Sequence, residues 1–244
     1  MSTPVKFYER DGITIYHGDA RDILPTIAPG SVDLVLTDPP YQSLDVEVTV
    51  GTTTRLVGLD QLAGKRLAAL GGRAWFETLP AADIIAAIQF GQSLLKPTGA
   101  TYVFADVKSG LELFPLLDPA NVIVWDKLKL GMGYNWRRMH EWIAFIPQPD
   151  HKLRNQGRGD IIRCNGVGEK SHPTEKPTGV LQSLILNSTD KDDLIINPFM
   201  GTGSLLVAAS KLGRRAIGID INEDYCITAY KRLQQTAMNL EIPA

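Results

Sequence analysis

Apolar residues in this chain gather in two kinds of run. One kind is short, rich in β-branched side chains, and stops at turn-forming residues, which is typical of buried strands. Runs of this kind occupy residues 13–19, 31–37, 99–106, 121–127, 140–147, 192–199 and 214–222. The other kind is longer, with apolar positions at helical spacing. It predicts helices within residues 81–95, 107–117, 176–188, 200–213 and 223–237.

These strands and helices largely alternate along the chain. Alternation predicts an α/β protein with a doubly wound, mostly parallel sheet and helices on both of its faces. A length of 244 residues fits one domain, spanning residues 1–244. Polar stretches without a clear period lie within residues 43–75 and 127–171. We interpret these two segments as insertions in the single domain.

The composition narrows the class of protein. With 44% hydrophobic and 21% charged residues, the chain has an ordinary globular composition. It lacks both an apolar run near the roughly 20 residues of a membrane span and the apolar core of a signal peptide, so we expect a cytoplasmic protein without a membrane partner. Two cysteines predict neither a disulfide framework nor a structural zinc site, and we expect no metal. A net charge of -2 means that a nucleic-acid partner would need a local basic patch.

A glycine turn between a strand and a helix is the first sign of a ligand. Gly201-Thr202-Gly203 follows the strand that ends near Asn197, and a helix starts at once. Glycines in such a turn let the backbone approach a ligand and direct amide groups at it. Asp220 ends the next strand, where a carboxylate can accept hydrogen bonds from two ribose hydroxyls. The alternative interpretation is a tight turn with a capping acid.

The spacing of the glycines indicates which kind of nucleotide is bound. A dinucleotide site would have a third glycine three residues after the second, but that position is Leu206. This pattern disfavours NAD and favours a ligand that carries adenosine without a pyrophosphate.

Four motifs follow one another along the chain: DPPY at 38–41, HPTEKP at 172–177, FMGTG at 199–203 and GID at 218–220. In this order they make the chain resemble the amino-type S-adenosylmethionine (AdoMet) DNA methyltransferases, which methylate the exocyclic amino group of adenine or cytosine. The catalytic motif precedes the glycine motif, so the resemblance is to the permuted beta group. It covers most of the chain and implies a Rossmann-like, seven-stranded sheet of the class I AdoMet methyltransferase type.

The resemblance assigns catalysis to Asp38, Pro39, Pro40 and Tyr41. An exocyclic amine is a poor nucleophile because its lone pair is delocalised into the ring. Asp38 and the carbonyl of Pro39 can each accept one amino hydrogen, which localises the lone pair on the nitrogen. The two prolines hold the backbone in place, and Tyr41 can stack on a base that has been flipped out of the duplex. Taken alone, the motif is equally well interpreted as a rigid turn with Tyr41 in the core.

The resemblance also implies a set of residues that contact AdoMet. They belong to the strand ends and to the two cofactor motifs: Asp19, Ala20, Asp38, His172, Thr174, Lys176, Asn197, Pro198, Phe199, Gly201, Thr202, Gly203, Ser204, Asp220 and Ile221. Asp19 is equally well interpreted as a helix N-cap, His172 as the donor of a loop hydrogen bond, and Lys176 as a solvated charge. Asn197 stands where family members usually have aspartate, which weakens the expected contact with the cofactor's amino group.

Basic residues between the catalytic and cofactor motifs form the expected DNA-binding face. They are Arg137, Arg138, Lys152, Arg154, Arg158 and Arg163, and they can contact phosphates or base edges. The alternative is a solvated loop. Segments 43–75 and 127–171 are the candidate target-recognition regions. Because they are short, we expect a homodimer, which would widen the contact with double-stranded DNA.

Methylation of the N6 amino group of adenine is the leading functional hypothesis. The rivals are the N4 amino group of cytosine, where the family more often has serine in place of Asp38, and methylation of protein glutamine or RNA, for which the motif order is unusual. A further alternative is a non-catalytic regulator that binds AdoMet or DNA. We expect a bacterial or phage-type protein associated with the nucleoid. The sequence identifies neither the target sequence nor a partner restriction endonuclease.

Overall fold

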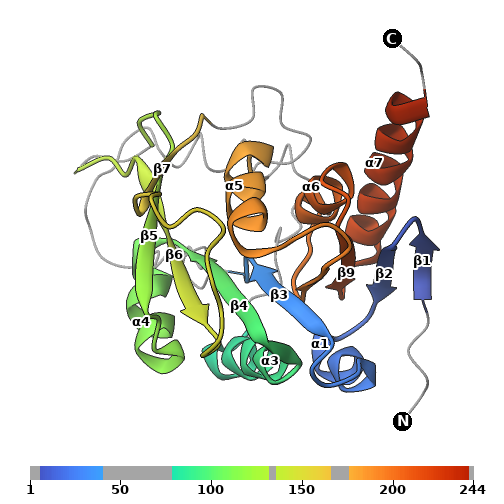
Figure 1. Cartoon of the computed structure of the whole chain (residues 1–244), viewed down its shortest axis with the longest axis horizontal. Coiled ribbons are helices and arrows are strands. Elements are labelled where there is room, and N and C mark those ends of the chain that lie inside the picture. Colours follow the sequence, from blue (N-terminus) through green and yellow to red (C-terminus); the bar gives the residue numbers. More distant parts are fainter. Residues whose placement is uncertain (1–5, 41–78, 132–135, 166–175, 242–244) are drawn as a thin grey trace, which may run out of the picture.

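The computed structural model describes residues 6–40, 79–131, 136–165 and 176–241, with side chains up to residue 235. These residues form a nine-stranded sheet covered by helices on both faces (Figure 1). Its strands are β1 (Lys6–Arg10), β2 (Ile13–His17), β3 (Val32–Thr37), β4 (Leu95–Ala105), β5 (Asn121–Asp126), β6 (His140–Pro147), β7 (Ile161–Arg163), β8 (Leu194–Asn197) and β9 (Arg215–Asp220). All seven predicted strands are confirmed, and the two additional strands, β1 and β7, lie at the edges of the sheet.

The predicted helices are confirmed as well. They are α3 (Ala81–Ser93), α4 (Val107–Leu117), α5 (Thr178–Ser188), α6 (Ser204–Lys211) and α7 (Glu223–Glu241). A short α1 (Ala20–Ile23), followed by the 3-10 turn η1 (Leu24–Thr26), was not predicted. None of the helices in the described ranges is long and apolar enough to cross a membrane.

The order of the strands is β1-β2-β9-β8-β3-β4-β6-β5-β7. Strands β2, β9, β8, β3 and β4 pair in parallel, whereas β6 is antiparallel to both of its neighbours, β4 and β5. The sheet is therefore mostly parallel, as predicted. The carboxyl ends of β2, β9, β8, β3, β4 and β5 all lie on the same side of the sheet, and β6 begins on that side. We call this side, where the strands end, the carboxyl edge or catalytic edge, as distinct from the outermost strands β1 and β7.

The helices divide into two groups that cover opposite faces of the sheet (Figure 1). Buried side chains of α5, α6 and α7 pack with Leu34 and Leu36 of β3 in one core cluster. Helices α1 and α3 pack against Val35 of the same strand, and α4 continues this second face beside α3. Both faces of β3 are thus covered, which explains why all of its side chains are apolar or buried rather than alternating.

The chain leaves β3 and β8 in opposite directions. After β3 it passes through α3 to β4 on one side, whereas after β8 it passes through α6 on the other face to β9. Such a divergence between neighbouring strands opens a crevice at their carboxyl ends, where α/β proteins bind ligands. Asp38 follows β3 and Asn197 ends β8, so both lie at this switch point.

Strand β4 begins at Leu95, four residues before the predicted start at residue 99. A salt bridge at the start of β3 accompanies this extension. Asp33 contacts Lys96 Nζ at 2.7 Å and accepts a hydrogen bond from the Leu194 backbone N–H at 2.9 Å. Asp33 thereby joins the starts of β3, β4 and β8 at the edge opposite the switch point.

Replacing Asp33 by asparagine is expected to lower the stability without altering the switch-point residues. The substitution removes the charge that pairs with Lys96, whose side chain is 37% exposed and so can hydrate. We expect a loss of about 1–2 kcal/mol of unfolding free energy, measured as a fall in Tm of about 2–8 °C. An unchanged Tm would show that the pair does not hold these strands together.

Candidate active site

The candidate site is centred on Asp38 and Pro39, directly beyond β3. Pro39 is buried and Asp38 is partly exposed. The fold brings Lys176 to the catalytic motif from the residues that precede α5, and its Nζ lies 2.7 Å from Asp38 Oδ2. Lys176 is 8% exposed, so its interpretation as a solvated charge is wrong. Its predicted contact with a cofactor remains a prediction.

Two further charged residues complete a chain of alternating charge. Glu141, at the start of β6, places Oε2 3.0 Å from Lys176 Nζ, in an ion pair. Its other oxygen accepts a hydrogen bond from Lys127 Nζ. Both ammonium groups also lie over aromatic rings, Lys176 over Phe104 and Lys127 over Trp125, each 5.1 Å from the ring centroid.

The charges in this network stabilise one another's ionised forms. Burial alone would lower the pKa of Lys176, but Asp38 and Glu141 outweigh it and raise that pKa above its usual value. Burial alone would raise the pKa of Glu141, but Lys176 and Lys127 outweigh it and lower that pKa. Both groups are therefore charged at neutral pH. The motifs identified Lys176 but missed Glu141 and Lys127, which belong to none of them.

The glycine turn after β8 is braced by the acid at the end of β9. Asp220 accepts hydrogen bonds from the Gly201 N–H at 2.8 Å and from the Asn222 N–H at 2.9 Å. Burial raises the pKa of Asp220, and these two N–H donors oppose the rise. The predicted proximity of the turn and Asp220 is thus confirmed. Asp220 serves the turn itself, as a capping acid would, and its contact with ribose remains a prediction.

The two glycines of the turn have different surroundings. Both have positive φ, 53° at Gly201 and 77° at Gly203, which favours glycine at both positions. A Cβ on Gly203 would lie only 2.6 Å from the Ala229 Cβ of α7, whereas a Cβ on Gly201 would meet nothing within 4 Å. Gly203 therefore allows two helices to approach closely, and Gly201 borders open space.

Asn197 connects the glycine strand to the catalytic strand. Its Oδ1 accepts hydrogen bonds from the Thr37 hydroxyl at 2.9 Å and from the Phe199 N–H at 3.1 Å. An aspartate could accept the same two bonds, so asparagine at this position preserves the local structure. Pro198 is buried, and the half-buried Phe199 packs against the clusters formed by α1, α3 and α4. Whether these residues contact a cofactor is untested.

The hydroxyl groups of the glycine turn have a partner that the sequence did not reveal. Arg232 Nη1 on α7 donates to the Thr202 carbonyl at 2.9 Å and to the hydroxyls of Thr202 and Ser204, each at 3.1 Å. Arg232 thus ties α7 to the start of α6. The available signal was an arginine on the inner face of an amphipathic helix, beside a turn with two hydroxyl side chains.

At the end of β2, Asp19 acts as the N-cap of α1. It accepts a hydrogen bond from the Arg21 N–H and forms an ion pair with the Arg21 guanidinium at 2.7 Å. This guanidinium, through hydrogen bonding, lowers the pKa of Asp19. The capping interpretation is therefore confirmed, while a cofactor contact remains a prediction. Ala20 is buried beside it, and Ile221 is 53% exposed beyond β9.

Several predicted site residues fall outside the described part of the chain: Tyr41, His172, Thr174, the whole 43–75 segment and residues 132–135 and 166–171 of the second insertion. Within the described ranges, no group of three or more His, Cys, Asp or Glu residues is arranged to hold a metal ion.

The six basic residues predicted to bind DNA lie in different places. Those at the same edge as Asp38, next to the ends of β5, β6 and β7, are Arg137, Arg138 and Arg163. Arg158 bonds to Ser183 in the middle of α5, and Arg154 pairs with Asp190, which precedes β8 at the opposite edge. Lys152 is close to Arg154 and accepts from it through its carbonyl oxygen. Residues 152 and 154 therefore lie far from the catalytic edge, because residues 148–151 bond to the start of β4.

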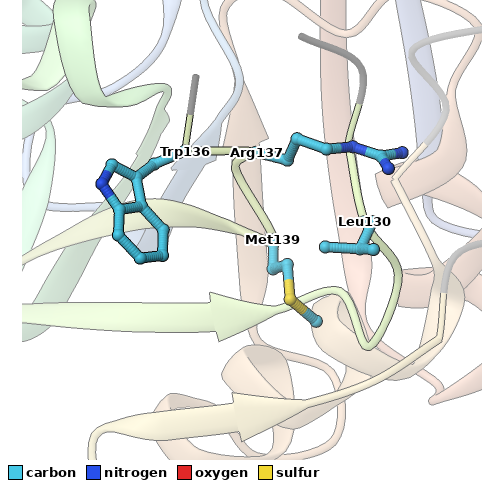
Figure 2. A pocket seen from close by; sticks show the side chains of 4 residues that line it. All are labelled: Leu130, Trp136, Arg137 and Met139. Carbon is cyan, nitrogen blue, oxygen red and sulfur yellow. The ribbon is translucent and has the colours of Figure 1, made fainter. Parts of the chain in front are cut away.

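An apolar surface hollow lies between β5 and β6, at the catalytic edge. It is lined by Leu130, Trp136, Arg137 and Met139, and Figure 2 shows Trp136 and Arg137 extending in opposite directions above Met139. Trp136 is fully exposed. Arg137 Nε donates to the Gly131 carbonyl at 2.6 Å.

The strand order and the switch-point site define the class of protein, which is the class I methyltransferase fold. The solved structure of M1.HpyAVI in complex with SAM matches 90% of this chain and 99% of that chain, with a TM-score of 0.63 and 21% identity. The cytosine-N4-specific PvuII DNA methyltransferase matches with the same TM-score and 14% identity, over 90% of this chain and 86% of that chain.

Sequence comparison finds similarity to DNA methylases. A family model described as DNA methylase, of the N6/N4 type, matches residues 124–231. The type II methyltransferase M2.LlaDCHI of Lactococcus lactis subsp. cremoris is 27% identical over 265 residues, covering 95% of this chain and 93% of that relative. The chain is thus similar to DNA methylases of the N6/N4 type over residues 124–231 and to a type II methyltransferase over most of its length.

Proposed function

We propose that this protein transfers the methyl group of AdoMet to the N6 amino group of adenine at specific sites in double-stranded DNA. The observation that carries the proposal is the position of Asp38 and Pro39 at the carboxyl end of β3, next to the glycine turn after β8. Asp38 and the Pro39 carbonyl offer two hydrogen-bond acceptors to an amine. The glycine turn beside them is suited to a nucleotide-like cofactor.

AdoMet fits the residues at the glycine turn. The space in front of Gly201 accommodates a ligand against the backbone. Asp220 accepts two backbone N–H groups, and a carboxylate has lone pairs for two more donors, such as ribose hydroxyls. When bound, AdoMet supplies an electrophilic methyl group on its sulfonium. The remaining proposed contacts, those of Asp19, His172, Thr174 and Lys176 among them, follow from the family resemblance.

The residues of this chain contribute position and hydrogen bonds. Asp38 accepts one hydrogen of the amine and the Pro39 carbonyl accepts the other, so that the nitrogen lone pair points at the methyl group. The nitrogen–carbon bond would form as the sulfur–carbon bond breaks, which would leave a neutral thioether, and the surplus proton of the amine would pass to solvent. The base reaches this edge by leaving the duplex, and Tyr41 is proposed to stack on it. Such stacking contributes roughly 1–3 kcal/mol.

N4 of cytosine is the alternative target, because the same two acceptors suit any exocyclic amine. The fold does not separate the two targets, since a cytosine-N4-specific enzyme shares it. The acid at position 38 favours adenine. A non-catalytic regulator is disfavoured because Asn197, the departure that motivated it, accepts the same internal hydrogen bonds that an aspartate could accept.

The choice among these functions rests on one experiment. The protein is incubated with tritiated AdoMet and unmethylated duplex DNA, and the DNA is digested to nucleosides. We expect the label in N6-methyldeoxyadenosine. Label in N4-methyldeoxycytidine would establish the alternative. In a parallel incubation with RNA in place of DNA, label in the RNA alone, or in neither nucleic acid, would exclude DNA methylation.

DNA is proposed to approach the catalytic edge, where Arg137, Arg138 and Arg163 are exposed. Arg138 and Arg163 form ion pairs with Asp106 and Asp126, which phosphates would have to replace or share. Lys152 and Arg154 are not proposed as contacts of the same duplex, because they lie near the opposite edge. A homodimer, the permuted beta-group classification and a role beside a restriction endonuclease, in a bacterial or phage setting, are proposals that follow from the family resemblance and from the type II relative.

A further inference from the structure

Glu141 is the one carboxylate of the charge network that has no role in the proposed methyl transfer. Its side chain is 13% exposed, and removing a carboxylate from water is costly unless cations compensate for it. Strand β6 runs antiparallel to β4 and β5, so its first residues lie at the carboxyl edge of the sheet, beside the residues that end β5. The antiparallel direction of this one strand therefore brings a second carboxylate to the site.

Glu141 and Asp38 share one ammonium group. Lys176 Nζ lies 2.7 Å from Asp38 and 3.0 Å from Glu141, and its side chain is only 9% exposed. Water therefore contributes little to its solvation, and the two carboxylates are charged partners that replace it. An ammonium divided between two anions binds each of them less strongly than it would bind one alone.

The strength of this contact matters for the role proposed for Asp38. A carboxylate that is strongly engaged by a buried ammonium is a weaker acceptor for the hydrogen of a neutral amine, because the cation withdraws electron density from it. Lys127 holds the other oxygen of Glu141 and stands over the Trp125 ring, which keeps Glu141 directed toward Lys176. The two positive charges of Lys127 and Lys176 equal the two negative charges of Glu141 and Asp38, so the network has no net charge.

We propose that Glu141 is a positioning residue for methyl transfer: by sharing the Lys176 ammonium with Asp38, it keeps Asp38 a strong acceptor for the hydrogen of the substrate amine. This inference rests on the proposed function of Asp38, and it holds for adenine and cytosine alike. Lys127 supports Glu141 in this role through the hydrogen bond that it donates to the other carboxylate oxygen.

The decisive variant is Glu141→Gln in the full chain, with kinetics on duplex DNA. We expect kcat to fall by up to about 100-fold, the effect of displacing a reacting group by about 1 Å. The KM for DNA and the Kd for AdoMet should stay within about threefold of the wild type. Glu141→Asp, which keeps the charge, should recover part of the lost kcat.

The pH dependence separates positioning from general loss of structure. Lys176 faces two acids, Asp38 and Glu141, which together raise its pKa. Loss of Glu141 removes one of them, so the buried ammonium should give up its proton at a lower pH. A neutral Lys176 would no longer hold Asp38 in place through their ion pair. In Glu141→Gln the alkaline loss of activity should therefore begin at a lower pH than in the wild type. In Lys127→Met, Glu141 loses the cation that competes with Lys176. The alkaline loss of activity in this variant should not begin at a lower pH than in the wild type.

Asp33→Asn is the matched control, because it breaks another acid–lysine pair of β3 at the opposite edge of the sheet. It should lower Tm and leave kcat and the pH profile unchanged. Wild-type kinetics in Glu141→Gln, or a lowered alkaline limit in Lys127→Met or Asp33→Asn, would overturn the inference. If Glu141→Gln does not fold, Glu141→Asp and Lys127→Met decide by the same criteria. A wild-type protein that methylates no DNA would instead refute the proposed function itself, and this inference with it.

Discussion

Asp38→Ala is expected to abolish methyl transfer to DNA. The substitution removes one of the two acceptors that localise the amine lone pair, and loss of one such preorganised group typically lowers kcat by about 100- to 1,000-fold. Asp38 is 27% exposed and Lys176 keeps Glu141 as a partner, so the variant should fold. Single-turnover kinetics with tritiated AdoMet measure the loss, and calorimetry should show that AdoMet binding largely survives.

Asp38→Asn provides the companion measurement. It keeps the shape of the side chain and one carbonyl acceptor but loses the charge that pairs with Lys176. Its activity should lie between those of the wild type and Asp38→Ala. Unchanged turnover in Asp38→Ala would refute the catalytic role and leave DPPY as a rigid turn.

Gly203→Ala is expected to destabilise the whole protein. A Cβ at this position would stand 2.6 Å from the Ala229 Cβ and 3.1 Å from the Ala229 Cα, and φ is 77°. Overpacking of this kind costs about 1–3 kcal/mol, and the left-handed backbone adds about 1–2 kcal/mol. We expect a loss of about 2–5 kcal/mol of unfolding free energy, measured by chemical denaturation.

Gly201→Ala is the matched control in the same turn. Its φ of 53° is also positive, but its Cβ would meet nothing within 4 Å. The stability loss should therefore be confined to about 1–2 kcal/mol from the backbone. Because the added methyl group enters the open space proposed for the cofactor, AdoMet affinity should fall by at least tenfold. Equal losses of stability in the two variants, with unchanged AdoMet binding in Gly201→Ala, would contradict both assignments.

The sequence was most informative where local pattern decides local structure. Seven apolar runs became seven strands, because short runs rich in β-branched side chains favour a buried or half-buried extended chain. Strand β7 escaped prediction since its three residues leave no periodic signal, and β1 since it is a partly exposed edge strand. The extension of β4 back to Leu95 depends on pairing with β3, which the local sequence does not encode.

The candidate site was predictable to the extent that its residues end parallel strands. Asp38, Asn197 and Asp220 follow or end β3, β8 and β9, and parallel strands present those ends at one edge. The distribution of arginines was less predictable. Segment 148–158 reads as one polar stretch, yet its backbone bonds to the start of β4 and its arginines to α5 and Asp190, which carries Arg154 to the opposite edge.

The sequence alone thus determined the fold class, the family resemblance and the strand ends that carry the catalytic acid and the glycine turn, because each depends on short-range patterns or on contiguous motifs. Only the tertiary structure decided the partners of these residues. Lys176 meets Asp38 and Glu141 from a distant part of the chain, and Arg232 reaches the glycine turn from α7. Such contacts depend on strand direction and helix packing, which place side chains together irrespective of their separation in sequence.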